Sequence, residues 1–172
     1  MKPLNLSVLL VGALFASGIA ADTCDALKKS DSDVSVKGLL WPRWYWSTAC
    51  KALKPSCVLL PESTEDVVDI VNLLLDSDEP FAVKSGGHNP NEYFASVEGG
   101  PLVSMERLNE VTLDEKAQTV RVGPGNRWED VQSALDGTGY TVVGGRIGHV
   151  GVGGLLLGGI LSSRRYSDIA LY

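Results

Sequence analysis

The chain has 172 residues, with 21 acidic and 15 basic side chains and a formal net charge of −6. An acidic chain without a block of basic residues is a poor candidate for binding nucleic acid or an anionic membrane surface. The length is typical of one domain with a modest hydrophobic core.

The first 21 residues have the pattern of a secretory signal peptide. Lys2 precedes an apolar run from Leu6 to Phe15, and small residues follow up to Ala20 and Ala21, where we expect cleavage. The run is shorter than the roughly 20 residues that a membrane-spanning helix needs. We therefore expect a secreted, extracellular protein that has no membrane association after cleavage.

Three cysteines follow the leader: Cys24, Cys50 and Cys57. An odd number of cysteines in an oxidising compartment predicts one disulfide and one free thiol. The spacing leaves open whether Cys57 pairs with Cys24 or with Cys50. None of the spacings resembles a zinc site, and we expect no bound metal.

We expect residues 22–60 to form an N-terminal arm that precedes a domain over residues 61–172. The arm contains three of the four tryptophans, Trp41, Trp44 and Trp46. Two uses of this cluster remain open. Packing of the arm against the core is the commoner use of such aromatic side chains, and stacking on a sugar is the alternative.

Residues 61–79 predict a helix at the start of this domain. Ser63 is a natural N-cap, and Asp66 is the capping-box partner three residues later. One face of the helix is apolar and is expected to be buried; its residues are Val67, Ile70, Val71, Leu74 and Leu75. Pro80 ends the segment, and residues 81–84 predict a short strand that leads into the sequence Ser-Gly-Gly-His.

Further strands are predicted at residues 101–105, 111–113 and 119–123, the last two joined by a polar turn. We expect Asn126 to cap a helix that buries three side chains and ends near Gly137; the three are Trp128, Val131 and Leu135. Residues 140–143 predict one more strand. The sequence therefore predicts an α+β fold in which a helix-backed sheet precedes the start of a second sheet.

Two glycine-rich loops stand out, at residues 85–88 and at residues 148–159. Consecutive glycines free backbone N–H groups to converge on anionic oxygens, so two such loops suggest a long nucleotide cofactor held at two points. Neither loop matches a P-loop or a complete dinucleotide-binding fingerprint. By spacing alone, tight turns are the commoner explanation of these glycines. His88 differs from an ordinary solvated loop histidine because it directly follows a glycine pair, where it could act as a nucleophile on the bound group.

Five segments occur in a fixed order along the chain: YWST, KPSCVLLPESTEDV, PFAVKSGGHNP, TVRVGPGNRWEDV and TVVGGRIGHVGVGGLLLGG. Together they resemble the secreted FAD-linked oxidoreductases with a PCMH-type flavin domain, which are related to berberine bridge enzyme and to fungal carbohydrate oxidases. The resemblance extends from about residue 45 to residue 165. It implies a PCMH-type, vanillyl-alcohol-oxidase-like FAD-binding domain that is incomplete at its C-terminus and lacks the substrate domain.

The resemblance also implies site residues. Ser85, Gly86 and Gly87 would bind the FAD pyrophosphate through backbone N–H groups, and His88 would bond covalently to the flavin 8α-methyl group. The later loop would line the flavin ring and pyrophosphate with five glycines: Gly151, Gly153, Gly154, Gly158 and Gly159.

Two further details follow from the resemblance. Some family members have a second flavin link through a cysteine in the later loop, but that position holds Ile147 here, so a single histidyl link is expected. Family members also have an N-terminal disulfide at the positions of Cys24 and Cys57, which would leave Cys50 as the free thiol.

The activity implied is flavin-dependent oxidation of a small-molecule alcohol or amine, with oxygen as the acceptor and release of peroxide. Two alternatives remain. The chain could be a truncated, catalytically inactive secreted fragment of such an enzyme. It could also be a small secreted protein that binds carbohydrate through its tryptophan cluster and holds no flavin.

Overall fold

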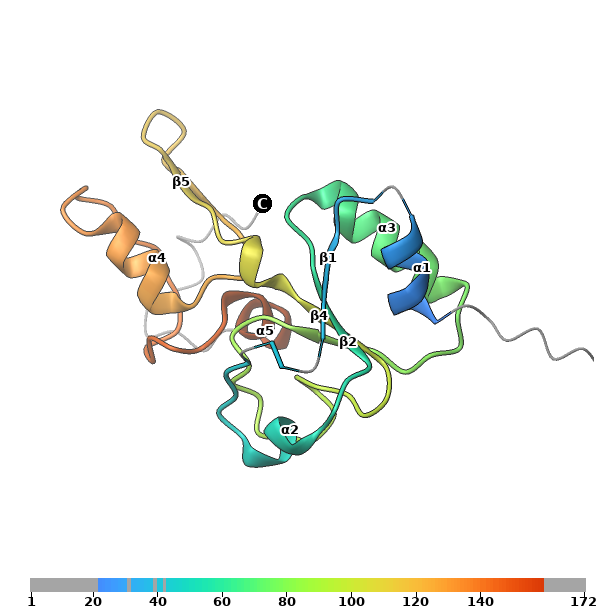
Figure 1. Cartoon of the computed structure of the whole chain (residues 1–172). Helices are drawn as coiled ribbons and strands as arrows, with labels where there is room; N and C mark the ends of the chain where they lie inside the picture. Colours follow the sequence, from blue (N-terminus) through green and yellow to red (C-terminus); the bar gives the residue numbers. More distant parts are fainter. Residues whose placement is uncertain (1–21, 31, 39, 42, 160–172) are drawn as a thin grey trace, which may run out of the picture.

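The computed structural model describes residues 22–30, 32–38, 40–41 and 43–159 (Figure 1). The predicted signal peptide lies outside the described residues, and so does the last part of the predicted domain, residues 160–172. Within the described ranges, no helix has the length and apolar character needed to cross a membrane.

A four-stranded sheet forms the centre of the first half of the chain. Its strands lie in the order β1 (Ser35–Lys37), β2 (Cys57–Leu60), β4 (Pro101–Ser104) and β3 (Ala82–Lys84). β2 and β3 are both parallel to β4, whereas β1 is antiparallel to β2. Because parallel strands end at the same edge of a sheet, the residues that follow β3 and β4 are neighbours.

The central strands bury both of their faces. One face of β2 packs against α1 (Thr23–Lys29) and α3 (Thr64–Leu75), which lie side by side in Figure 1. The opposite face packs against Tyr45, Cys50 of α2 (Thr48–Ala52), and the loop around Val97. Alternate residues of a strand point to opposite faces, so a continuous apolar sequence such as Cys-Val-Leu-Leu is suited to a strand buried on both sides.

The disulfide joins Cys24 of α1 to Cys57 of β2, with Cα atoms 6.0 Å apart. The pairing implied by the family resemblance is therefore confirmed, and the alternative between Cys50 and Cys57 is wrong. Cys50 is a free, buried thiol, and its Sγ lies 3.1 Å from the carbonyl oxygen of Asn91, to which it donates a hydrogen bond.

Helix α3 begins as predicted. The Ser63 hydroxyl oxygen accepts a hydrogen bond from the Asp66 N–H at 3.0 Å, and the Asp66 carboxylate accepts one from the Ser63 N–H at 3.2 Å. Ile70 and Leu74 are buried, but two other residues of the predicted apolar face, Val71 and Leu75, are 44% and 78% exposed. Each residue advances a helix by about 100°, so these two lie beyond the flank of the stripe centred on Ile70.

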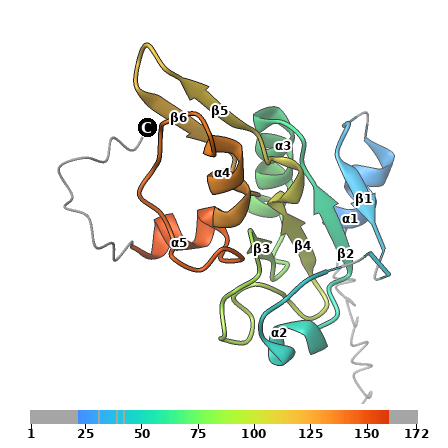
Figure 2. The ribbon, with the colours of Figure 1, turned by 90° about the vertical axis from the view of Figure 1, so that its left-hand side faces the viewer.

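The second half of the chain has its own small core. A hairpin of β5 (Val111–Asp114) and β6 (Thr119–Val122) follows β4 after one 3₁₀ turn (Met105–Arg107), and α4 (Trp128–Leu135) and α5 (Val152–Gly158) follow the hairpin (Figure 2). The predicted buried side chains of α4 form the centre of this core, together with one residue of α5: Trp128, Val131, Leu135 and Val152. The expected α+β organisation, with a helix-backed sheet before a second sheet, is confirmed.

Two local predictions are wrong. Asn126 does not cap α4; its buried amide donates to the carbonyl oxygens of Gly123 and Glu110 at 3.0 and 3.3 Å, which fastens the end of the hairpin. Arg127 has the N-cap position instead, and the Asp130 carboxylate accepts its backbone N–H at 2.8 Å.

Residues 140–143 do not form the predicted strand. A strand needs a neighbouring backbone to complete its hydrogen bonds. In the described part of the chain this segment has no such neighbour, and Val142 packs against the core around Trp128 instead. Val142 therefore serves side-chain packing in place of strand pairing.

Candidate cofactor-binding site

The two glycine-rich loops meet in the structure. The first loop, residues 85–88, follows β3. The second glycine-rich segment, residues 148–159, comprises the turn before α5 and α5 itself. The Ser85 hydroxyl donates to the carbonyl oxygen of Pro124 at 2.6 Å and accepts the N–H of Gly153 at 3.2 Å. One side chain thus joins the first loop, the turn before α4 and the start of α5.

Glycine is required where the loops touch. A Cβ atom on Gly86 would lie 2.5 Å from the backbone nitrogen of Gly151. Gly87 has φ of +72°, and a Cβ there would lie 2.6 Å from the carbonyl oxygen of Trp44. Side chains at these positions would collide with backbone, which cannot move aside as a flexible side chain can.

A cavity of about 270 Å³ lies between the loops, lined by Gly86, Gly87 and His88 on one side and by Val150, Gly151, Gly154 and Leu155 on the other. The backbone N–H groups of residues 86–88 have no hydrogen-bond acceptor within the described ranges. Free N–H groups in a glycine cradle are suited to the oxygens of a phosphate or pyrophosphate. The residues present therefore fit the anionic part of a nucleotide.

The predicted site residues do not all meet. Ser85, Gly86, Gly87 and His88 lie beside Gly151, Gly153 and Gly154. Gly158 and Gly159, by contrast, are at the far end of α5, outside this cavity, and a Cβ on either would meet no atom within 4 Å.

His88 lies in a cluster of aromatic rings. It stacks on Trp46 with ring centroids 5.5 Å apart, and the centroid of His149 is 5.3 Å away. His149 makes an edge-to-face contact with Trp44. The Arg127 guanidinium lies over the ring of the same tryptophan, 4.5 Å from its centroid. Both histidines of the chain thus share one site.

The tryptophan cluster is divided between packing and this site. Trp41 packs against the core, as the commoner use of such residues predicts, and its Nε1 donates to Glu106 at 2.9 Å. Trp44 and Trp46 are 40% and 55% exposed beside His88.

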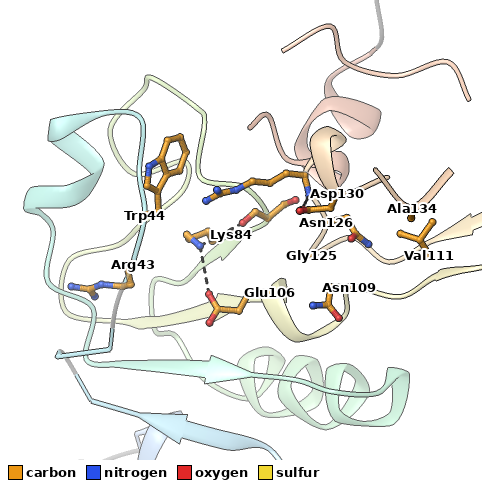
Figure 3. A pocket seen from close by; sticks show the side chains of 12 residues that line it. Arg43, Trp44, Lys84, Glu106, Asn109, Val111, Gly125, Asn126, Asp130 and Ala134 are labelled. Atoms are coloured by element: carbon orange, nitrogen blue, oxygen red, sulfur yellow. Dashed lines mark hydrogen bonds and ion pairs between the residues drawn. The ribbon is translucent and has the colours of Figure 1, made fainter. Parts of the chain in front are cut away.

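A second, larger groove of about 780 Å³ lies beside the first loop, and Ser85 borders both cavities (Figure 3). Lys84 enters this groove with only 4% of its side chain exposed, and its Nζ lies 3.9 Å from Glu106 Oε2. Burial lowers the pKa of Lys84, the Glu106 carboxylate opposes that shift, and the Arg127 and Arg43 guanidinium groups add to it.

Sequence reasoning missed four residues of this region: Lys84, Glu106, Arg127 and His149. Lys84 had a usable signal, because a charged residue at the end of an apolar strand, two positions before a glycine pair, is unusual in a buried strand. The other three come from segments far from the first loop, and no spacing in the sequence relates them to it. Within the described ranges, no group of three or more metal-ligating side chains is assembled.

Residues 55–170 match the model of the family described as FAD binding domain. The chain belongs to this family. A fungal relative, the "Uncharacterized FAD-linked oxidoreductase" of Arthroderma benhamiae, is 48% identical over 119 residues, which cover 69% of this chain and 24% of the relative. The "FAD-dependent monooxygenase prx3" of Penicillium roqueforti is 38% identical over 170 residues, which cover 92% of this chain and 32% of the relative.

Solved structures agree with the fold of an FAD binding domain. The glucooligosaccharide oxidase of Acremonium strictum superposes with a TM-score of 0.65 at 24% identity, over 78% of this chain and 29% of the oxidase. The BBE-like 1 variant D396N of Physcomitrella patens gives a TM-score of 0.66 at 22% identity, over 77% of this chain and 30% of that protein. The PCMH-type fold expected from the resemblance is confirmed. The chain spans about a quarter of the length of the first curated relatives.

Proposed function

We propose that this chain holds FAD as part of a secreted oxidoreductase, with a single covalent bond between His88 and the flavin 8α-methyl carbon. The observation that carries the proposal is the meeting of two glycine loops through Ser85, beside N–H groups of residues 86–88 that have no acceptor in the part of the chain that the structure describes. A structural neighbour at 25% identity, the glucooligosaccharide oxidase of Acremonium strictum, has a 6-S-cysteinyl, 8α-N1-histidyl FAD.

The residues have separate tasks in this proposal. The backbone N–H groups of the first loop bind the pyrophosphate, Ser85 fixes the second loop against the first, and His88 supplies the ring nitrogen that forms the bond. Forming the link would break one C–H bond of the methyl group and the N–H bond of the His88 ring and make one C–N bond; the two protons and two electrons released would pass to oxygen, giving hydrogen peroxide. Ile147 cannot form a thioether, so one link is proposed.

Bound FAD would accept a hydride from an alcohol or amine carbon of a small-molecule substrate, and oxygen would reoxidise it. A covalent bond suits a secreted enzyme because a cofactor that dissociates outside the cell is lost by dilution. Secretion itself follows from the pattern of residues 1–21, and N-terminal sequencing of the secreted product should begin at Ala21 or Asp22.

The first prediction tests the link. The chain is secreted from a eukaryotic host and precipitated with acid, and flavin absorbance is measured in the washed pellet. We expect a yellow pellet from the wild type, a colourless one from His88→Ala, and a yellow one from the control His149→Ala, which removes the chain's other imidazole.

The remaining outcomes separate the alternatives. Flavin that stays with the native protein but washes out of the denatured pellet would contradict the covalent link and would support non-covalent FAD binding. A colourless wild type in both states would favour the inactive fragment. Retention of a carbohydrate column that depends on Trp44 and Trp46, without flavin, would favour the sugar-binding protein.

A further inference from the structure

Glu106 is held by both of its carboxylate oxygens. Trp41 Nε1 donates to Oε1 at 2.9 Å, and the Ser104 hydroxyl donates to Oε2 at 3.0 Å. These partners come from the N-terminal segment and from the end of β4, so the orientation of the carboxylate is fixed from two directions. In Figure 3 the carboxylate points at the Lys84 ammonium, at an Oε2–Nζ distance of 3.9 Å.

Lys84 needs this carboxylate because two arginines of the same groove repel its ammonium group. The guanidinium groups of Arg43 and Arg127 border the same groove, and the Tyr45 ring lies beside the ammonium, with Nζ 5.8 Å from its centroid. Asp130 lines the groove too, but among the described residues only Glu106 is within ion-pair distance of Lys84. A buried charge without a partner costs several kcal/mol or loses its proton.

Lys84 in turn supports the first glycine loop. Its Nζ donates to the carbonyl oxygen of Ser85 at 3.5 Å. Its Cε lies 3.2 Å from the place of a Cβ on Gly87, so the lysine side chain runs directly beneath that glycine. A shift of Lys84 would therefore remove the contacts that support the loop from below.

We propose that Glu106 is a positioning residue of the cofactor site, which holds the Lys84 ammonium beneath the Ser85–His88 loop and so fixes both the loop that would bind the pyrophosphate and a positive charge beside that loop. The proposal deepens the proposed function and rests on it for the identity of the bound group. In this proposal Glu106 acts through Lys84 and is not itself a ligand of the bound group.

The second prediction tests the ion pair without any cofactor. The ¹³Cε resonance of Lys84 in the FAD-free chain, assigned by its loss in Lys84→Arg, is followed as a function of pH. Since the carboxylate favours the ammonium, Glu106→Gln should lower the pKa of Lys84 by about one pH unit or more. An unchanged Lys84 titration in Glu106→Gln would overturn the proposal.

The consequence for the cofactor is a change in pH dependence. An amine with a lowered pKa loses its charge earlier as pH rises, so FAD attachment in Glu106→Gln should fall off at lower pH than in the wild type. The double variant Lys84→Arg with Glu106→Gln should recover attachment at high pH, because a guanidinium keeps its charge. Loss of attachment at all pH values in both variants, with the fold intact, would overturn a role through charge. A wild type without flavin would refute the proposed function alone, since the lysine titration still decides the ion pair.

Discussion

At the scale of single residues, the site depends on positions that have no room for a side chain. Gly86 and Gly151 bring two backbones together from loops that are far apart in the sequence. Glycine is therefore required at Gly86 and Gly151 because another backbone lies against them, and not because a turn needs glycine there. Gly38, in contrast, has no atom within 4 Å of the place of a Cβ.

The third prediction uses this difference. Gly86→Ala should destabilise the fold by about 1–3 kcal/mol, because the new methyl group forces the two loops apart. It should also abolish FAD attachment at temperatures where the variant remains folded. Urea unfolding measures the first effect, and flavin absorbance of the precipitated protein measures the second.

Gly38→Ala is the matched control, with the same chemical change in open space. Equal loss of stability in both variants would show that the loops can separate at no cost, and would remove the argument for close contact between them.

At the scale of single elements, α3 shows how local sequence defines a helix. Ser63 and Asp66 satisfy each other's backbone groups at its first turn, and the helix packs on the sheet through Ile70 and Leu74. The position of α3 matters to the site because this helix connects β2 to β3, the strand that carries Lys84 and the first loop.

The fourth prediction concerns this cap. Ser63→Ala removes the acceptor of the Asp66 N–H and should lower the free energy of unfolding by about 1 kcal/mol. Thermal unfolding followed by circular dichroism measures it. Thr64→Ala, which changes the exposed first residue of the helix, should have a much smaller effect. Similar losses in both variants would mean that the cap hydrogen bond contributes little.

At the scale of the whole molecule, the disulfide fastens the N-terminal segment to the central sheet. It joins α1 to β2 across 33 residues of sequence and lies within the core formed with α3. The closed loop contains β1, Trp44 and Trp46, so the disulfide restricts the unfolded chain over the same segment that supplies two aromatic residues to the site region.

The fifth prediction follows from the loop length. The double variant Cys24→Ser with Cys57→Ser should lose about 2–4 kcal/mol of stability. Reductant should lower the unfolding midpoint of the wild type and leave that of the double variant unchanged. Cys50→Ser should keep the response to reductant, because this thiol is not in the disulfide. A wild type indifferent to reductant under unfolding conditions would contradict the prediction.

Much of the fold and the first loop could be predicted because their signals are local. A cap, an apolar period and a turn each act within a few residues, which is why α3, α4 and the β5–β6 hairpin were found. The failures have tertiary causes. Residues 140–143 have the composition of a strand but no partner backbone among the described residues, and the Asn126 side chain fastens a hairpin instead of capping a helix.

The sequence by itself determined the family, the capped helix and the Ser-Gly-Gly-His loop, because ordered motifs and local hydrogen bonds are written in consecutive residues. Only the tertiary structure decided which glycines of the second loop meet the first, with Gly151 and Gly153 in contact and Gly158 remote. It also decided that Glu106 faces Lys84 and that His149 lies beside His88. These pairs depend on where β3 and β4 end and where α5 begins in space, and the separation of residues along the chain does not determine those positions.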